Sequence, residues 1–176
     1  NSTSIINAPN AWDKLRGFAQ VGVVDQGIYL NPSTQQTHPD IVRNLRKHLS
    51  RAAVSGQSGL GSFFAVDDDI VESEFKGHGT HVAGLVAANP LPTGDGIGMR
   101  GTCPECSLSI MKIDRGELSM DRAGQLVAEL VSGGTQVINL SFGYPANDTP
   151  SRPPGFCADP ANANDVMCLA LTFAKN

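Results

Sequence analysis

The sequence predicts an α/β fold in which helices cover both faces of a mainly parallel central sheet. Four short apolar runs, at residues 20–25, 108–113, 136–141 and 166–173, have the length and composition of buried parallel strands. Apolar residues recur at helical spacing between the strands, most clearly at residues 119–132. Strands that alternate with helices in this way form parallel sheets, because each helix crosses over one face.

An N-terminal arm precedes the first strand. Residues 1–15 are expected to be irregular and to end in a short helix opened by Pro9, since proline suits the first helical position. Trp12 in this helix is expected to pack on the body of the protein. After the strand at 20–25, residues 26–76 contain many turn residues and few long apolar runs, which indicates extended loops.

The first strand ends in an acid, and a histidine begins a later helix. Asp25 precedes Gly27, and it lies at the carboxyl end of a strand, where open α/β sheets gather ligands and catalytic groups. The glycines on both sides of His78 leave its imidazole open to a cleft. A neutral imidazole acts as a general base when a carboxylate holds its second nitrogen. Each residue alone also suits a plain turn or a helix end.

The second half of the chain returns to regular order. Ser119 is a suitable N-cap for the helix at 119–132. A strand is expected at 136–141, and a polar loop follows it. The last strand, at 166–173, ends shortly before Asn176.

Two motifs taken together resemble the subtilisin-like serine proteases, the subtilases. An aspartate that ends a strand, with glycine two positions later, is followed by His78-Gly79-Thr80-His81-Val82-Ala83-Gly84, as in that family. The family's catalytic residues follow the chain order Asp, His, Ser. The resemblance implies a subtilisin-like three-layer fold. Further segments that match family motifs are residues 5–12, 37–40, 101–104, 137–143 and 171–176.

The resemblance assigns roles to residues at matching positions. Asp25 would orient His78, and His78 would take a proton from a serine and return it to the leaving amine. Asn176 would donate a hydrogen bond to the oxyanion of the tetrahedral intermediate. His81 is expected to pack within its helix. The substrate peptide would bind as an added strand along Gly116, Glu117, Leu118, Ser141, Phe142 and Gly143.

The match runs along the whole chain but does not include the whole family domain. The serine nucleophile of subtilases lies in a G-T-S-M-A motif, which does not occur in these 176 residues. We therefore interpret residues 1–176 as the N-terminal portion of one catalytic domain, with the serine supplied by a segment or second chain. This predicts a serine endopeptidase that cleaves proteins or peptides through an acyl-enzyme. The alternative is an inactive homologue that binds peptides or proteins without cutting them.

The region between the aspartate and the histidine departs from the family. Asp25 and His78 are farther apart than in compact bacterial subtilases, so residues 26–76 are expected to contain an inserted surface loop. Asp40 matches a position that often ligates calcium, whereas the acidic cluster at 67–74 lacks an EF-hand pattern. The resemblance therefore allows a structural calcium ion at Asp40, while the chemistry itself requires no cofactor.

The composition is that of a folded protein, with 40% hydrophobic and 17% charged residues and a net charge of −4. The negative charge argues against nucleic acid or an anionic membrane as a partner, and no apolar run is long enough to span a bilayer. Because the chain begins at Asn1 without Met, removal of a leader and a pro-segment is the simplest account of this terminus. The protein is therefore expected to be secreted and made as a zymogen.

The 4 cysteines allow three pairings. Cys103-Pro104-Glu105-Cys106 is a C-x-x-C sequence, but neither a thioredoxin-like context nor a second such pair for zinc accompanies it. Two local structural disulfides, Cys103–Cys106 and Cys157–Cys168, are the preferred pairing.

Overall fold

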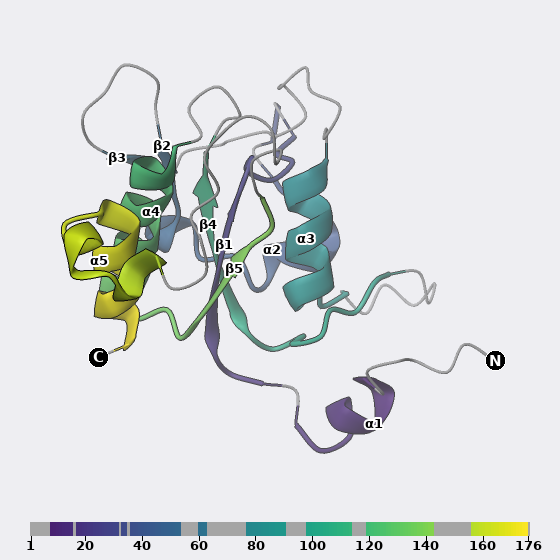
Figure 1. Cartoon of the computed structure of the whole chain (residues 1–176). Coiled ribbons are helices and arrows are strands. Elements are labelled where there is room, and N and C mark those ends of the chain that lie inside the picture. Colours follow the sequence, from purple (N-terminus) through teal and green to yellow (C-terminus); the bar gives the residue numbers. More distant parts are fainter. Residues whose placement is uncertain are drawn as a thin grey trace.

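A five-stranded sheet forms the centre of the computed structural model, with the strand order β3-β2-β4-β1-β5 (Figure 1). β2, β4, β1 and β5 are parallel, and β3 is antiparallel to β2, which confirms the mainly parallel sheet expected from the sequence. The strands are β1 (Gln20–Asp25), β2 (Arg51–Ala53), β3 (Leu60–Ser62), β4 (Ser107–Lys112) and β5 (Val137–Leu140). The structure describes residues 8–15, 17–31, 33–34, 36–53, 60–62, 77–90, 98–113, 119–142 and 156–175.

The central strand β1 pairs with β4 on one side and with β5 on the other. Its residues alternate between the two faces of the sheet, because side chains of a strand point to opposite faces in turn. Val23 therefore packs into the core on one face, and Val24 packs into a separate core on the other face.

Two helices cover the face of the sheet on which Val23 lies. These are α2 (Pro39–Val42) and α3 (His78–Ala87), and Figure 1 shows α3 running beside the sheet. A short 3-10 helix, η1 (Lys47–Leu49), leads from this layer into β2. The buried side chains of this core are Val23, Ile28, Ile41, Leu45, Ala52, Val82, Ala83, Ala87, Leu108 and Ile110.

The opposite face is covered by α4 (Met120–Ser132), on which α5 (Val166–Lys175) packs. A Cβ at Gly22 would lie 2.5 Å from Cδ1 of Leu130, so the glycine lets α4 approach β1 closely. The helix begins as the sequence predicts, because the Ser119 hydroxyl accepts a hydrogen bond from the Arg122 N–H at 3.1 Å. The buried side chains of this core are Val24, Met111, Ile113, Leu126 and Leu130.

The strand expected at residues 166–173 is wrong, because these residues form helix α5. The side chain of Asp165 accepts hydrogen bonds from the N–H groups of Met167 and Cys168 at 3.0 and 3.2 Å, which caps the helix. A continuous apolar run does not distinguish a buried strand from a buried helix. Two 3-10 helices, η4 (Phe156–Ala158) and η5 (Pro160–Asn162), precede α5.

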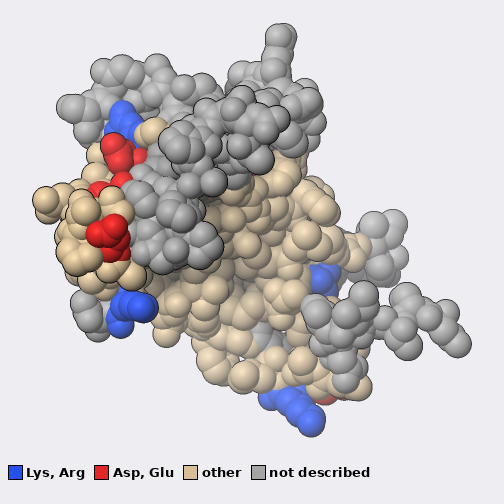
Figure 2. All heavy atoms as spheres, viewed as in Figure 1, with Lys and Arg blue, Asp and Glu red and all other residues tan. Residues whose placement is uncertain are grey.

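The N-terminal arm carries the short helix α1 (Ala8–Trp12), below the sheet in Figure 1. The indole N–H of Trp12 donates to the carbonyl of Thr102 at 3.2 Å, which confirms that this side chain lies on the body. Figure 2 shows charged side chains at the borders of this face, whereas the uncovered part of its middle has none. Among the described residues, no helix has the length and apolar character needed to cross a membrane.

The loop region between β1 and α3 is described only in part. Its described residues form α2, η1, β2 and β3. Residues 54–59 and 63–76, which include the whole acidic cluster and part of the region expected to contain the surface insertion, lie outside the described residues.

Candidate active site

The last residue of β1 and the first residue of α3 meet at the carboxyl end of the parallel sheet. Nδ1 of His78 lies 2.9 Å from Oδ1 and 3.0 Å from Oδ2 of Asp25. Asp25 is only 3% exposed, whereas the His78 side chain is 36% exposed. The pair therefore joins a buried carboxylate to an imidazole that reaches the surface.

The backbone around Asp25 holds its carboxylate in place. The Gln26 N–H donates to Oδ1 of Asp25 at 2.8 Å. The Asp25 carbonyl accepts a hydrogen bond from the Ile113 N–H at 2.8 Å, which extends the pairing of β1 with β4 to the end of the strand. The carboxylate thus has a fixed position before it contacts the imidazole.

Glycines and one threonine hold the start of α3 against the loop that follows β1. Gly77 has a φ of 78°, a left-handed conformation that favours glycine. A Cβ at Gly79 would overlap the carbonyl oxygen of Gly27, so a side chain there would displace the helix. The Thr80 hydroxyl accepts a hydrogen bond from the Tyr29 N–H at 2.7 Å. This role of Thr80 was not predicted from the sequence, although its position in the first turn of the helix was consistent with such a contact.

The arrangement selects one tautomer of the imidazole. An ionised carboxylate only accepts hydrogen bonds, so Nδ1 of His78 carries the proton and Nε2 keeps its lone pair. An imidazole in this state can remove a proton from a hydroxyl group, and the carboxylate then stabilises the imidazolium that forms. The Asp25–His78 pair can therefore serve as a general base.

The model of the subtilase family matches residues 19–172, most of the chain. The chain belongs to the subtilase family. Both the Asp25–His78 pair and the sheet that positions it lie within the matched subtilase region.

Curated subtilases share about three in ten residues with this chain. Thermitase of Thermoactinomyces vulgaris is 29% identical over 78% of the chain and 42% of its own length. Subtilisin Savinase of Lederbergia lenta is 30% identical over 96% of the chain and 53% of its own length. The chain thus spans about half or less of these relatives.

Solved structures agree on the fold. The epidermin leader peptide processing serine protease of Staphylococcus aureus superposes with a TM-score of 0.62 at 21% identity. That match covers 95% of this chain and 37% of the other. The α/β architecture is therefore that of subtilisin-like structures over part of their length.

The substrate-binding residues expected from the sequence are described in part. Ser141 and Phe142 follow β5, and because β5 is parallel to β1 they lie at the same edge of the sheet as Asp25. Phe142 packs against the core beneath α4, and the Ser141 hydroxyl donates to the side-chain oxygen of Asn139 at 2.7 Å. Gly116, Glu117, Leu118 and Gly143, together with the expected oxyanion donor Asn176, lie outside the described residues.

Asp40, the expected calcium ligand, is 7% exposed. Its Oδ2 accepts a hydrogen bond from the Met99 N–H at 2.8 Å and lies 3.9 Å from Nδ1 of His38. Within the described ranges, no three His, Cys, Asp or Glu side chains are grouped closely enough to hold a metal ion. Calcium at Asp40 therefore stays a prediction that depends on ligands from other parts of the chain.

The expectation that His81 packs within its helix is wrong. His81 is exposed, because Val82 and Ala83 occupy the face of α3 that turns to the sheet. Its side chain lines a pocket of about 480 Å³ between α3 and α2. His38 and Asp40 also line this pocket.

Both disulfides pair as the sequence analysis expected. Cys103 is bonded to Cys106 and Cys157 to Cys168, with Cα–Cα distances of 5.4 and 5.2 Å. The first lies in the loop before β4, and the second ties η4 to α5.

Proposed function

We propose that this chain supplies the base and the orienting acid of a serine endopeptidase that hydrolyses protein or peptide substrates. The observation that carries the proposal is the contact of both Asp25 carboxylate oxygens with Nδ1 of His78 in a member of the subtilase family. A buried acid and a partly exposed imidazole at the carboxyl end of a parallel sheet suit acyl transfer better than a structural ion pair.

In the proposed mechanism, Nε2 of His78 takes the proton of the serine hydroxyl as the oxygen attacks the scissile carbonyl. Asp25 stabilises the imidazolium and keeps Nε2 directed at the serine. The imidazolium then protonates the leaving amine, and a water molecule hydrolyses the acyl-enzyme by the same base catalysis. Asn176 is proposed to stabilise the oxyanion by donating a hydrogen bond.

The serine is proposed to come from a segment or a second chain outside these 176 residues. Two surface features support such an association. β5 pairs only with β1 among the described strands, and Val137 and Leu140 on β5 are exposed by 53% and 39%. A strand edge with exposed apolar side chains is a ready template for another strand. We further propose a secreted protein that is made with a pro-segment and carries structural calcium at Asp40.

A reconstitution experiment tests the proposed function. The chain is combined with the serine-bearing portion of its subtilase domain, treated with a fluorophosphonate probe and assayed with a casein substrate. We expect the serine to be labelled and the substrate to be cut, and a His78→Ala variant to lose turnover while it keeps its circular dichroism spectrum. Undiminished turnover in His78→Ala would rule out this role of the histidine. Binding of peptide without labelling or cleavage would favour the alternative, a peptide-binding module.

A further inference from the structure

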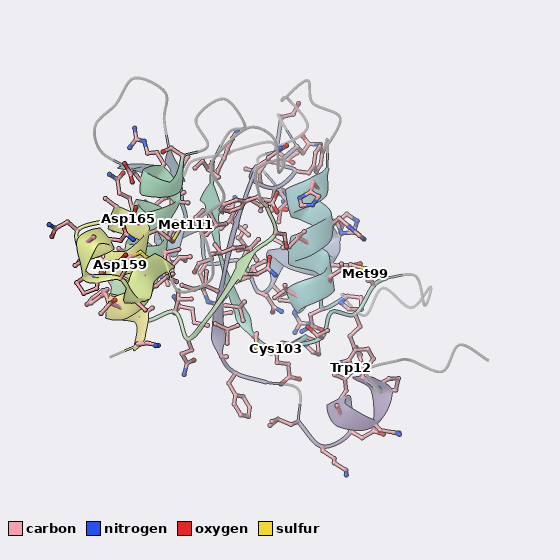
Figure 3. All side chains as sticks on the ribbon, in the orientation of Figure 1. Trp12, Met99, Cys103, Met111, Asp159 and Asp165 are labelled. Carbon is pink, nitrogen blue, oxygen red and sulfur yellow. A yellow bond between two sulfur atoms is a disulfide. The ribbon has the colours of Figure 1, made fainter. Side chains whose placement is uncertain are left out.

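The loop at residues 98–106, which we name the cysteine loop, contacts segments that are far apart in the sequence. The Cys103–Cys106 disulfide closes it, and the Cys106 N–H also donates to the Cys103 carbonyl at 3.1 Å. Figure 3 shows Cys103 and Trp12 at the same end of the molecule, below the sheet. A tight covalent turn thus lies between the N-terminal arm and the end of α3.

The cysteine loop caps the C-terminus of α3. The last carbonyl groups of a helix have no partner within the helix, so other groups must satisfy them. The side-chain amide of Asn44 donates to the carbonyls of Ala87 and Pro104, both at 2.8 Å, and so joins the helix end to the loop. Three loop N–H groups donate to the same helix end: Gly101 to Ala88 at 2.9 Å, Thr102 to Leu85 at 2.9 Å and Cys103 to Val86 at 2.8 Å.

The same loop holds α1. The indole of Trp12 donates to the Thr102 carbonyl, and the guanidinium of Arg100 lies 5.4 Å from the centre of the Trp12 ring. This distance suits a cation–π contact. α1 has no buried residue, so no core packing adds to these contacts. These contacts of Trp12 therefore join α1 to the cysteine loop.

The chain that leads from α1 to β1 passes directly over the disulfide. Gly17 has a φ of 86°, and a Cβ there would overlap Sγ of Cys103 and lie 3.1 Å from Sγ of Cys106. Bonded sulfur atoms are about 2 Å apart, and two separate thiols need a wider, non-bonded separation. The Gly17 backbone thus lies directly against the disulfide, so a change in the positions of the two sulfurs on reduction would alter the packing between the loop to which Trp12 binds and the chain that leads from α1.

We propose that the Cys103–Cys106 disulfide is a thiol–disulfide exchange site, and that its reduction releases α1 from the body of the protein. The reaction partner is a dithiol reductant. Its thiolate attacks Sγ of Cys103, since Cys103 is partly exposed and Cys106 is only 1% exposed. The S–S bond breaks, and Cys106 leaves as a thiolate that takes up a proton.

The second thiol of the reductant then attacks the mixed disulfide. Cys103 is released as a thiol, the reductant becomes a disulfide, and the protein has gained two electrons and two protons. α1 then leaves the cysteine loop. The sheet and its two helix layers stay folded, because the core clusters on both faces contain no residue of the cysteine loop.

The release of α1 can be measured by tryptophan fluorescence, because Trp12 in α1 is the single tryptophan of the chain. The test uses the wild-type chain and a Cys157→Ser/Cys168→Ser variant, in which Cys103–Cys106 is the remaining disulfide. On addition of dithiothreitol, we expect the emission of both proteins to move to longer wavelength and acrylamide quenching to rise about twofold. The matched control, Cys103→Ser/Cys106→Ser, should show the shifted emission before reduction and no response to dithiothreitol.

Limited trypsin digestion gives a second measurement that does not depend on the variants. Reduction of the wild-type chain should speed cleavage after Lys14, which lies between α1 and Gly17, by tenfold or more, with an unchanged far-ultraviolet circular dichroism spectrum. Emission, quenching and cleavage that are the same in the oxidised and reduced wild type would overturn the proposal. Loss of the circular dichroism spectrum on reduction of the Cys157→Ser/Cys168→Ser variant would also overturn it, because the Cys103–Cys106 disulfide would then support the whole fold.

Discussion

The carbonyl oxygen of Gly27 occupies the space that a side chain at Gly79 would need. This contact brings the first turn of α3 against the loop after β1, and it places His78 within hydrogen-bond distance of Asp25. A Gly79→Ala substitution should therefore push the helix away and lower the free energy of unfolding by about 1–3 kcal/mol. Urea unfolding measures the change.

The matched control for this substitution is Gly133→Ala at the end of α4. Gly133 has a φ of −78°, and a Cβ there would lie no closer than 3.4 Å to its neighbours. We expect a change below about 0.5 kcal/mol for this exposed site. Equal effects of the two substitutions would contradict the close approach at Gly79.

An Asp25→Asn substitution should reduce kcat of the reconstituted enzyme on the order of 10⁴-fold. The amide keeps the shape of the carboxylate, but it can donate to Nδ1 and so favour the wrong imidazole tautomer. The measurement is peptide hydrolysis, normalised to the amount of enzyme that a fluorophosphonate labels. Asp13→Asn, an exposed site in the N-terminal arm, should leave kcat unchanged. A kcat within tenfold of wild type in Asp25→Asn would exclude an orienting role for this acid.

Removal of the Ser119 hydroxyl should weaken the start of α4. The hydroxyl accepts from the Arg122 N–H in the first turn of the helix. The first N–H groups of a helix generally need acceptors from outside the helical hydrogen-bond pattern. Ser119→Ala should therefore lower the free energy of unfolding by about 1 kcal/mol. Ser132→Ala, at the exposed far end of the same helix, is the control and should have little effect. Thermal unfolding of both variants gives the comparison, and a neutral Ser119→Ala would mean that other groups cap α4.

An Asn44→Leu substitution should destabilise the join between α3 and the cysteine loop. Asn44 is buried, and its loss leaves two carbonyl groups without their donor. The expected cost is about 2–3 kcal/mol, because a buried polar group without a hydrogen bond is unfavourable. Chemical denaturation measures the free energy of unfolding of the wild type and the variant. A difference below about 0.5 kcal/mol would show that water replaces the amide.

Calcium binding at Asp40 can be tested by thermal unfolding with and without the ion. If Asp40 is a ligand, calcium at one hundred times its dissociation constant should stabilise the chain by about 2.7 kcal/mol. Asp40→Asn removes the charge but keeps an oxygen that can accept from the Met99 N–H, so the variant should fold and lose the response. A calcium response that survives in Asp40→Asn would place the ion elsewhere.

The sequence predicted the parts of the fold in which local chemistry and tertiary packing agree. The β-branched run before Asp25 forms β1, and the Ser119 cap begins α4 where expected. The Asp25–His78 contact was predictable from the resemblance, because a motif of glycines and a histidine matched a known family.

The sequence-based predictions were wrong where tertiary packing decides between two local structures that the sequence allows. The apolar run at 166–173 suits either a strand or a helix, and the cap by Asp165 together with packing against α4 gives the helix. The position of His81 depends on which side of α3 faces the sheet, which the small residues around it do not reveal. The cysteine loop was visible as a C-x-x-C motif, but its contacts with Trp12 and Asn44 join residues more than fifty positions apart.

The position of β1 in the middle of the sheet has a consequence for biosynthesis. β1 precedes the other four described strands in the chain, yet its two neighbours, β4 and β5, begin at Ser107 and Val137. β4 begins 82 residues after the end of β1 (107 − 25) and β5 begins 112 residues after it (137 − 25), so the nascent chain carries an apolar strand without these partners while the intervening residues are made. Contacts of such long sequence separation form slowly, and unpaired strands aggregate readily. We infer that β1 is a segment of the newborn chain that a chaperone would protect.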